Sequence, residues 1–350
     1  NTAGKEESRM PHEAEKEKSS GQETFSIGAF QPEDAEGLVR LFKAVYGDGY
    51  PIRLFYDAEA IRQANAEGRY ITIVGRTPSG EVVGANHLYR SAPYHGLYES
   101  GVGLVHKDYR AGGILTAILK YMYDGFVPGK PHMEELFGEA VCNHIISQKL
   151  VVPFRHIETA LEVALMPAEA YTQEQSAPGR VATLDAFRCY VPRPHRVFLP
   201  DVYAGILRRI YARLDDERDL APSVPDVPAE AETRAELTVF DFARVARIAV
   251  SRSGADFVSR LIALEDEAED RHAVVFQVWL NLTEPWVAQI VDALRRHGYF
   301  LGGVLPRWFD GDGLLMQKIR CEPDFDKIML LSAFAKDLLT EIRAYHAKVS

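Results

Sequence analysis

The chain has 350 residues, 47% of them hydrophobic, which is enough for roughly two ordinary domains with buried cores. Its formal net charge of −10 argues against broad nucleic-acid binding, and no apolar run is long enough to cross a membrane. The three cysteines, Cys142, Cys189 and Cys321, are widely spaced and form no CxxC motif. This disfavours a disulfide framework and favours a cytoplasmic protein.

The N-terminal 22 residues are polar and rich in Glu, Lys and Ser. Such a segment cannot bury enough apolar area to offset the entropy of ordering, so residues 1–22 are predicted to be a disordered tail or linker. The sequence starts at Asn1 instead of Met, and an upstream domain on the same polypeptide is therefore one expectation.

From Phe25 the hydrophobic pattern alternates between strand and helix periods. A helix is expected to begin near Pro32, because Pro and acidic residues favour the first turn. The expected strands are 25–30, 70–75, 81–89, 99–105, 136–141, 156–165 and 181–190, with helices at 58–66, from Ile114, and at 145–151. Residues 168–179 are expected to form a loop between the last two strands.

The rest of the chain suggests a helix, a linker and a second unit. Residues 202–214 are amphipathic, and 215–236 carry three prolines among acidic residues. Strands are expected at 273–280, 300–304 and 314–319, with helices at 284–297 and 327–347 and a hairpin at Asp310–Gly313. The predicted domains are 1–22, a tail; 23–200; 201–235, helix and linker; and 236–350.

The stretch 98–123 organises the first domain: a strand, a turn with Arg110-Ala111-Gly112-Gly113, and a helix with one apolar face. Glycines at the start of a helix let backbone N–H groups approach an anion, and the helix dipole favours negative charge there. This turn is therefore either a pyrophosphate cradle or simply a tight connection between strand and helix.

The segment resembles the acyl-CoA-binding motif of the GNAT superfamily of N-acyltransferases, Arg/Gln-x-x-Gly-x-Gly/Ala. Arg110 and Gly113 match in place, whereas Leu115 departs from the last position. The element order resembles a GNAT core, which implies an α/β (α+β) fold with a mixed central sheet flanked by helices. Residues 236–319 resemble the C-terminal half of a second, degenerate GNAT unit without the motif, with a generic α/β cap as the alternative. The resemblance implies acetyl-CoA or another acyl-CoA as co-substrate, bound by Leu104, Val105, Arg110, Ala111, Gly112, Gly113, Ile114, Leu115, Thr116, Asn143 and Ser147.

Acyl transfer to an amine requires a base for the ammonium proton and a donor for the oxyanion. The resemblance assigns the donor to the Val105 N–H and the base to Glu99, where some family members have a strand glutamate. Alternation would place Glu99, Gly101 and Gly103 on one open face. Glu99 as an edge residue pointing to water is the alternative. Glu139 is the second candidate base, because a carboxylate in an apolar strand is costly unless paired or functional.

Asn143 follows the next strand, where GNAT members often contact the CoA arm, although Asn is also a common helix cap. The tyrosine acid usual in the family is missing, because residues 145–154 contain no Tyr. Either His144, Cys142 or water protonates the thiolate, or the site binds acyl-CoA without efficient turnover.

No metal is predicted, because the histidines show no ligand spacing on a helix. His87, His95, His106 and His144 are expected to be ordinary polar side chains near the cleft. Asp310-Gly311-Asp312-Gly313 lacks the later Glu of a calcium loop and suits a hairpin.

The sequence thus favours an acyl-CoA-dependent N-acyltransferase, most simply an N-acetyltransferase, acting on a small-molecule or protein amine by direct attack in a ternary complex. A non-catalytic acyl-CoA sensor is the main alternative, and a tandem-GNAT aminoacyl-transferase is the third. Neither nucleic acid nor a membrane is expected as a partner, and a homodimer is left open.

Overall fold

The computed structural model describes residues 25–167, 179–224 and 226–349, and the chain divides into two compact units. Unit 1 contains residues up to Leu88 and Val102–Phe126, and unit 2 contains Tyr89–Gly101 and the chain from Val127. Each unit is described by itself below. Among the described residues, no helix is long and apolar enough to cross a membrane.

Unit 1 is a small sheet with helices against it. Strand β1 (Ser26–Ala29) pairs antiparallel with β2 (Tyr70–Arg76), and β3 (Val82–Tyr89) follows β2 in the strand order. The helices are α1 (Ala35–Tyr46), α2 (Ala58–Ala66) and α3 (Ile114–Lys120), and α3 continues into a π-helical segment, Tyr121–Phe126. Phe42 and Phe55 stack in the core with ring centroids 4.3 Å apart. The Asp57 side chain caps α2 by accepting hydrogen bonds from Glu59 and Ala60.

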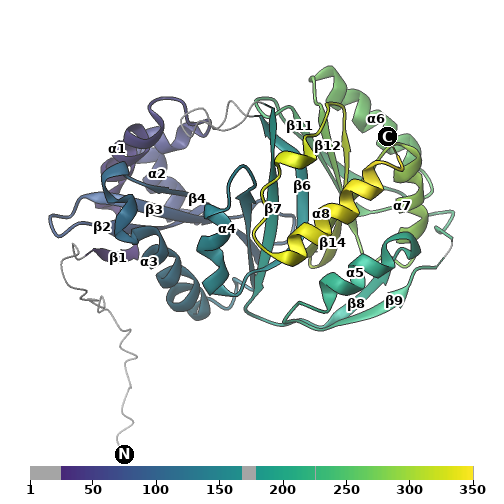
Figure 1. Cartoon of the computed structure of the whole chain (residues 1–350), viewed down its shortest axis with the longest axis horizontal. Coiled ribbons are helices and arrows are strands. Elements are labelled where there is room, and N and C mark those ends of the chain that lie inside the picture. The colour runs from purple at the N-terminus through teal and green to yellow at the C-terminus, as the bar shows by residue number, and fades with distance from the viewer. Residues whose placement is uncertain (1–24, 168–178, 225, 350) are drawn as a thin grey trace, which may run out of the picture. The chain divides into compact units, whose positions relative to one another are not determined.

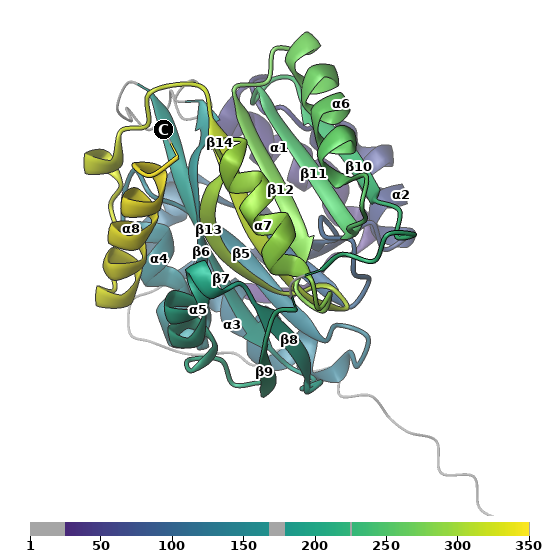
Figure 2. The same cartoon turned by 90° about the vertical axis from the view of Figure 1, so that its right-hand side faces the viewer.

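Unit 2 contains a large mixed sheet with the order β4-β5-β7-β6-β13-β14-β12-β11-β10 (Figures 1 and 2). Two neighbouring pairs, β4 with β5 and β11 with β12, are parallel, and the other pairs are antiparallel. The predicted fold class, a mixed α/β sheet flanked by helices, is confirmed. The strands are β4 (Leu97–Val105, entering unit 1 at Val102), β5 (Glu135–Val141), β6 (Ile157–Pro167), β7 (Arg180–Cys189), β10 (Arg234–Phe240), β11 (Val245–Arg252), β12 (Val275–Asn281), β13 (Phe300–Phe309) and β14 (Gly311–Ile319).

Helices and a second small sheet cover this large sheet. The parallel pair of β8 (His195–Leu199) with β9 (Arg218–Pro222) forms the small sheet. Helix α8, the yellow helix in Figure 1, contacts β13 and β6. The helices of unit 2 are α4 (Ile146–Val151), α5 (Ala204–Tyr211), α6 (Phe257–Asp270), α7 (Val287–Arg296) and α8 (Ala333–His346).

The two halves of the large sheet have the same strand connectivity, counted outward from the central strands β6 and β13. From β6 outward the neighbours are β7, β5 and β4; from β13 outward they are β14, β12 and β11. The central strands meet at Ala160 and Gly303. Four residues later, Ala164 and Arg307 both have left-handed backbones, with φ of 54° and 55°. The two halves therefore share connectivity and the positions of their irregularities.

The predicted linker differs from the structure. Residues 215–236 contain β9 and the start of β10, because Arg218–Pro222 finds a parallel partner in β8 that proline content alone cannot reveal. The units also divide at Leu88, Val102 and Phe126, not within 201–235. The predicted terminal helix begins later, at Ala333, where Ser332 caps it. The tail 1–22 and most of the loop 168–179 lie outside the described residues.

Gly303 tests the junction between the two halves. Its φ is +143°, and a Cβ there would lie 2.2 Å from the Thr159 carbonyl oxygen and 2.5 Å from the Ala160 Cα. Backbone atoms cannot move aside cheaply, so Gly303→Ala should lower the free energy of unfolding by about 2 kcal/mol or more in urea denaturation. The control is Gly205→Ala in α5, where a Cβ meets nothing within 4 Å. Equal stability of the two variants would contradict the close approach.

Candidate active site

The predicted cradle is an open turn at the start of α3, within unit 1. Lys107–Gly112 form a 3₁₀ segment, and Gly113 has a left-handed backbone with φ of +69°. A Cβ on Gly113 would meet nothing within 4 Å, whereas one on Gly112 would lie 3.2 Å from the Phe25 ring. Gly113 is exposed and Gly112 is half-buried. The backbone of this turn is therefore accessible on the Gly113 side, as an anion cradle requires.

The other predicted cofactor residues of unit 1 surround this turn. Leu104, Val105 and Ile114 are buried, and the Arg110 Nε donates to the Val105 carbonyl at 3.4 Å. Ala111 and Thr116 are exposed, and Leu115 is half-buried. The Arg110 side chain thus braces the turn against the end of β4.

β4 departs from the regular alternation expected for it. Val102 has a left-handed backbone, with φ of 54°, which interrupts the two-residue period. The expected open face is also filled. A Cβ on Gly101 would lie 2.5 Å from the Tyr89 hydroxyl oxygen, and one on Gly103 would lie 2.7 Å from the Asn86 Oδ1. The two glycines therefore admit neighbouring polar side chains instead of leaving an empty channel.

Glu99 is buried in unit 2 at the end of a short parallel ladder. The paired residues of β4 and β5 run from Leu97–Glu135 to Glu99–Phe137. The Tyr89 hydroxyl donates to one Glu99 carboxylate oxygen, and the Ser91 hydroxyl donates to the other, both at 2.5 Å. The alternative of an edge glutamate pointing to water is thereby excluded.

Glu99 belongs to a group of carboxylates on four strands, here called the carboxylate cluster, of which Glu139 is half-buried and the others are buried: Glu99, Glu139, Glu162 and Asp185. A single guanidinium, that of Arg247 on β11, lies among them. Its Nη2 is 3.3 Å from the Glu139 Oε1 and 3.1 Å from the Glu162 Oε2. One oxygen of Asp185, Oδ1, is buried without a hydrogen-bond partner among the described residues. Among the described residues, the Arg247 guanidinium thus pairs with two of these acids, half-buried Glu139 and buried Glu162.

Burial raises the pKa of three carboxyl groups of the cluster, those of Glu99, Glu162 and Asp185. It raises the pKa of Glu99 to about 7, and the neighbouring charge of Glu139 adds to the effect. Burial likewise raises the pKa of Glu162 to about 7, although Arg247 opposes the shift. The pKa of Asp185 is raised by burial and by the Glu162 charge. The carboxyl groups of Glu99 and Glu162 are therefore expected to titrate near neutral pH.

Three of these carboxylates also have the spacing of a metal site. Glu139, Glu162 and Asp185 each offer an oxygen, and these oxygens lie within 4.8 Å of one another. The cation seen beside two of them is the Arg247 guanidinium, which disfavours a second positive charge there. The absence of a metal stays a prediction.

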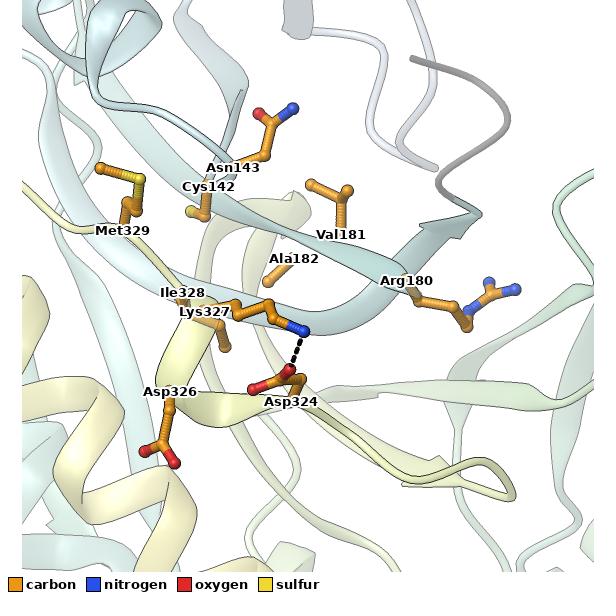
Figure 3. Close-up of a pocket in the computed structure, with 10 residues that line it drawn as sticks. All are labelled: Cys142, Asn143, Arg180, Val181, Ala182, Asp324, Asp326, Lys327, Ile328 and Met329. Atoms are coloured by element: carbon orange, nitrogen blue, oxygen red, sulfur yellow. Dashed lines mark ion pairs between the residues drawn. The ribbon is translucent and has the colours of Figure 1, made fainter. Parts of the chain in front are cut away.

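Asn143 lines a cavity of about 320 Å³ in unit 2 (Figure 3). α4 begins after Ile145 without a side-chain cap, so Asn143 does not cap this helix. Its Oδ1 is buried without a hydrogen-bond partner among the described residues, as expected of a group held for a ligand. Met329 lies beside Cys142, and the opposite wall contains Asp324, which is paired with Lys327.

The other residues near Asn143 have structural contacts. The Ser147 hydroxyl donates to the Val141 carbonyl at 3.3 Å. Burial raises the pKa of the Cys142 thiol, whose Sγ contacts the Ala140 carbonyl, so this thiol is a poor proton donor. The His144 Nδ1 accepts from the Ile146 N–H at 3.3 Å.

His87 is a core residue of unit 1. Its ring packs against Phe55 with centroids 4.9 Å apart, and its Nδ1 lies 3.2 Å from the Val102 carbonyl oxygen. Burial lowers the pKa of His87 to about 4, so the ring is neutral at pH 7. His87 is therefore an ordinary core side chain, and its position relative to the proposed cleft stays a prediction.

The Asp310–Gly313 hairpin is confirmed, with Asp310 at φ of 78° between β13 and β14. Asp312 is fully buried and accepts from the Arg218 Nε at 2.7 Å. Arg218 lies in the stretch predicted as a linker, so this buried pair ties β9 to the large sheet.

Sequence reasoning did not identify five residues that surround the predicted bases. For Glu162, Asp185 and Arg247 the sequence contained a signal, because a lone charge in an apolar strand is costly without a partner. What could not be found is the pairing, since Arg247 and Glu139 are 108 positions apart. The five are Tyr89, Ser91, Glu162, Asp185 and Arg247.

Comparison with known proteins gives low-identity structural likenesses. No family model matches the sequence, and no curated protein matches it. An N-acetyltransferase from Staphylococcus aureus Mu50 matches 47% of this chain and 98% of its own, with 15% identity and a TM-score of 0.38. The ribosomal-protein-S5-alanine acetyltransferase from Vibrio fischeri matches 47% and 93%, with 8% identity and a TM-score of 0.39.

A third likeness is the ribosomal-protein-S18-alanine N-acetyltransferase from Escherichia coli, which matches 48% of this chain and 96% of its own at 14% identity and a TM-score of 0.37. These three matched structures are thus acetyltransferases, and each covers about half of this chain. Identities and TM-scores this low carry no functional argument.

The carboxylate cluster predicts an unusual pH dependence of stability. A carboxyl whose folded pKa is about 7, above its ordinary 4.5, binds more protons folded than unfolded. Its stabilising contribution is full below pH 4.5 and is lost as the pH rises through 7. Glu162→Gln should therefore flatten the fall in unfolding free energy between pH 4.5 and 7.5, measured by urea denaturation. Exposed Glu322→Gln is the control, and an unchanged slope in Glu162→Gln would contradict the raised pKa.

Proposed function

We propose that this chain is an acyl-CoA-dependent N-acyltransferase, most simply one that transfers acetyl from acetyl-CoA to a primary amine by direct attack. The observation that carries the proposal is the environment of Glu99. It is a buried carboxylate with a pKa raised to about 7, held by two hydroxyl groups at the end of the β4–β5 ladder. This is the residue that the resemblance assigns as base.

The environment of Glu99 suits proton transfer from an alkylammonium acceptor. A base is most effective when its pKa lies near the working pH, and an ordinary glutamate is too weak for this task. Burial supplies the shift, and the Tyr89 and Ser91 hydroxyls fix the two oxygens. The proton moves from the ammonium nitrogen to Glu99, and the freed lone pair attacks the thioester carbonyl. The carbon–sulfur bond then breaks, and CoA leaves as a thiolate that takes up a proton from water.

The turn Arg110–Gly113 is the proposed site for the diphosphate of CoA. Its fit rests on the exposed left-handed Gly113 and on the start of α3, where backbone N–H groups and the helix dipole favour anions. Asn143, with a buried unpartnered Oδ1, is proposed to bind an amide of the CoA arm.

The C-terminal half of unit 2 is proposed to be a degenerate GNAT copy that does not bind acyl-CoA. Its parallel pair, β11 with β12, is continuous from Val245–Val275 to Val250–Leu280. The turn before α6 is also blocked, because a Cβ on Gly254 would lie 2.2 Å from the Ala231 carbonyl oxygen. The Thr233 hydroxyl accepts from the Gly254 N–H, so the chain itself occupies the place of a phosphate.

A non-catalytic acyl-CoA sensor is the second candidate. It is favoured by α4, which contains no Tyr, and by the raised pKa of the Cys142 thiol, which leave no evident acid for the thiolate. The two candidates differ in whether thiol is released.

Glu99→Gln separates the candidates. Removing the base should lower kcat for thiol release on an amine panel by roughly 10²–10⁴-fold, while acetyl-CoA affinity by calorimetry stays within about twofold. Glu158→Gln, which changes a glutamate paired with Arg213, is the control. Acetyl-CoA binding without thiol release on any amine, unchanged in Glu99→Gln, would favour the sensor.

Gly113→Glu tests the cradle. A carboxylate placed in the proposed diphosphate path should reduce acetyl-CoA affinity by at least about 100-fold, through charge repulsion and lost space. Gly68→Glu is a matched control, because Gly68 also has a left-handed backbone (φ +67°) and open space. Equal affinity of the two variants for acetyl-CoA would overturn the assignment of Arg110–Gly113.

A further inference from the structure

The symmetry of the large sheet assigns an equivalent position to Glu99. Starting at the central pair, Ile157 and Phe300 each lie three residues before Ala160 and Gly303. On one side the register runs from Ile157 to Phe187, then to Phe137 and Glu99. On the other side it runs from Phe300 to Gln317, then to Gln277 and Arg247. Arg247 therefore occupies, in the C-terminal half, the register position that Glu99 occupies in the first.

Arg247 is directed into the carboxylate cluster, not toward solvent. Its side chain is 12% exposed, and its Nε donates to the Gln277 Oε1 at 2.8 Å. Its Cζ lies over the Trp279 ring, 5.3 Å from the ring centre, a distance at which the cation and the ring attract each other. Its Nη2 then reaches Glu139 and Glu162. Gln277 and Trp279 of β12 thus orient the Arg247 guanidinium toward Glu139 on β5 and Glu162 on β6.

We propose that Arg247 is a positioning residue for Glu99: its guanidinium holds and neutralises Glu139 and Glu162, leaving Glu99 as the carboxylate that takes up the acceptor's proton. The degenerate half would thus contribute charge to the site of the first half. This inference rests on the proposed function for the role of Glu99, whereas the electrostatic link between Arg247 and Glu99 is independent of it.

The charges around Glu99 act on its pKa in opposite directions: Glu139 raises it and Arg247 lowers it. Each ionised neighbour discourages ionisation of Glu99, and with several buried acids the outcome depends on where the positive charge lies. Arg247 acts against the raised pKa of Glu99 and of Glu162. The titratable groups that face Glu99 or Arg247 are Tyr89 before β4, Glu139 on β5, Glu162 on β6, Asp185 on β7 and Arg247 itself on β11.

The test is titration of Glu99 in the full chain without ligand. Glutamate carboxyl ¹³C labelling, with the Glu99 resonance assigned by its loss in Glu99→Gln, gives the midpoint directly. In Arg247→Met the midpoint should rise by at least one pH unit, a tenfold tighter proton, because the compensating charge is gone. Arg247→Lys, which keeps the charge, should recover at least half of the shift. If thiol release is observed, the acidic limb of kcat/KM should move with the midpoint.

Arg252→Met is the control, since Arg252 is exposed on the same strand. A Glu99 midpoint that changes by less than 0.3 pH units in both Arg247 variants, or equally in Arg252→Met, overturns the inference. If Arg247→Met does not fold, the double variant Glu162→Gln/Arg247→Met removes a buried acid together with the cation. There, the Glu99 midpoint is compared with that of Glu162→Gln alone, and a difference of less than 0.3 pH units between the two overturns the inference. Failure of the proposed function gives no thiol release but leaves this titration informative.

Discussion

The site depends on one desolvated interaction, that of the Arg247 guanidinium with the carboxylates of Glu139 and Glu162. Removing several acids from water costs several kcal/mol per ion, and a single buried cation offsets only part of this cost. The remainder is met by protons, which is why the pKa values of Glu99 and Glu162 rise to about 7. The same imbalance that is predicted to lower stability at high pH raises the pKa of Glu99 into the range expected of a base.

The two halves of the large sheet share a plan and differ in chemistry. Ala164 and Arg307 have the same left-handed conformation at matching places, so the bends of the sheet are repeated. The turn at Gly113 is open, whereas the turn at Gly254 is packed against its own chain. In such a repeated architecture, the half with the closed turn can still contribute side chains to the other half. Arg247 is an example, because it pairs with Glu139 and Glu162 of the first half.

Prediction from sequence succeeded where the signal is local. Helix 58–66, the hairpin at Asp310–Gly313 and the strand-turn-helix around Gly113 follow from periodicity, capping residues and glycines, which act within a few positions. It failed at residues 215–236, where proline content suggested a linker and a distant partner made a strand. The prediction of an open strand face at Gly101 and Gly103 also failed. The local sequence does not indicate that Tyr89 and Asn86 fill the space beside these glycines.

The sequence by itself determined the mixed α/β order of elements, the glycine turn before a helix and the acidic residue in the strand ahead of it. These features depend on side-chain periodicity and backbone freedom over short distances. Only the tertiary structure decided which charges meet. Glu99, Glu139, Glu162, Asp185 and Arg247 come from five strands, and their protonation depends on mutual distance and on the exclusion of water, which exist only once the sheet has assembled.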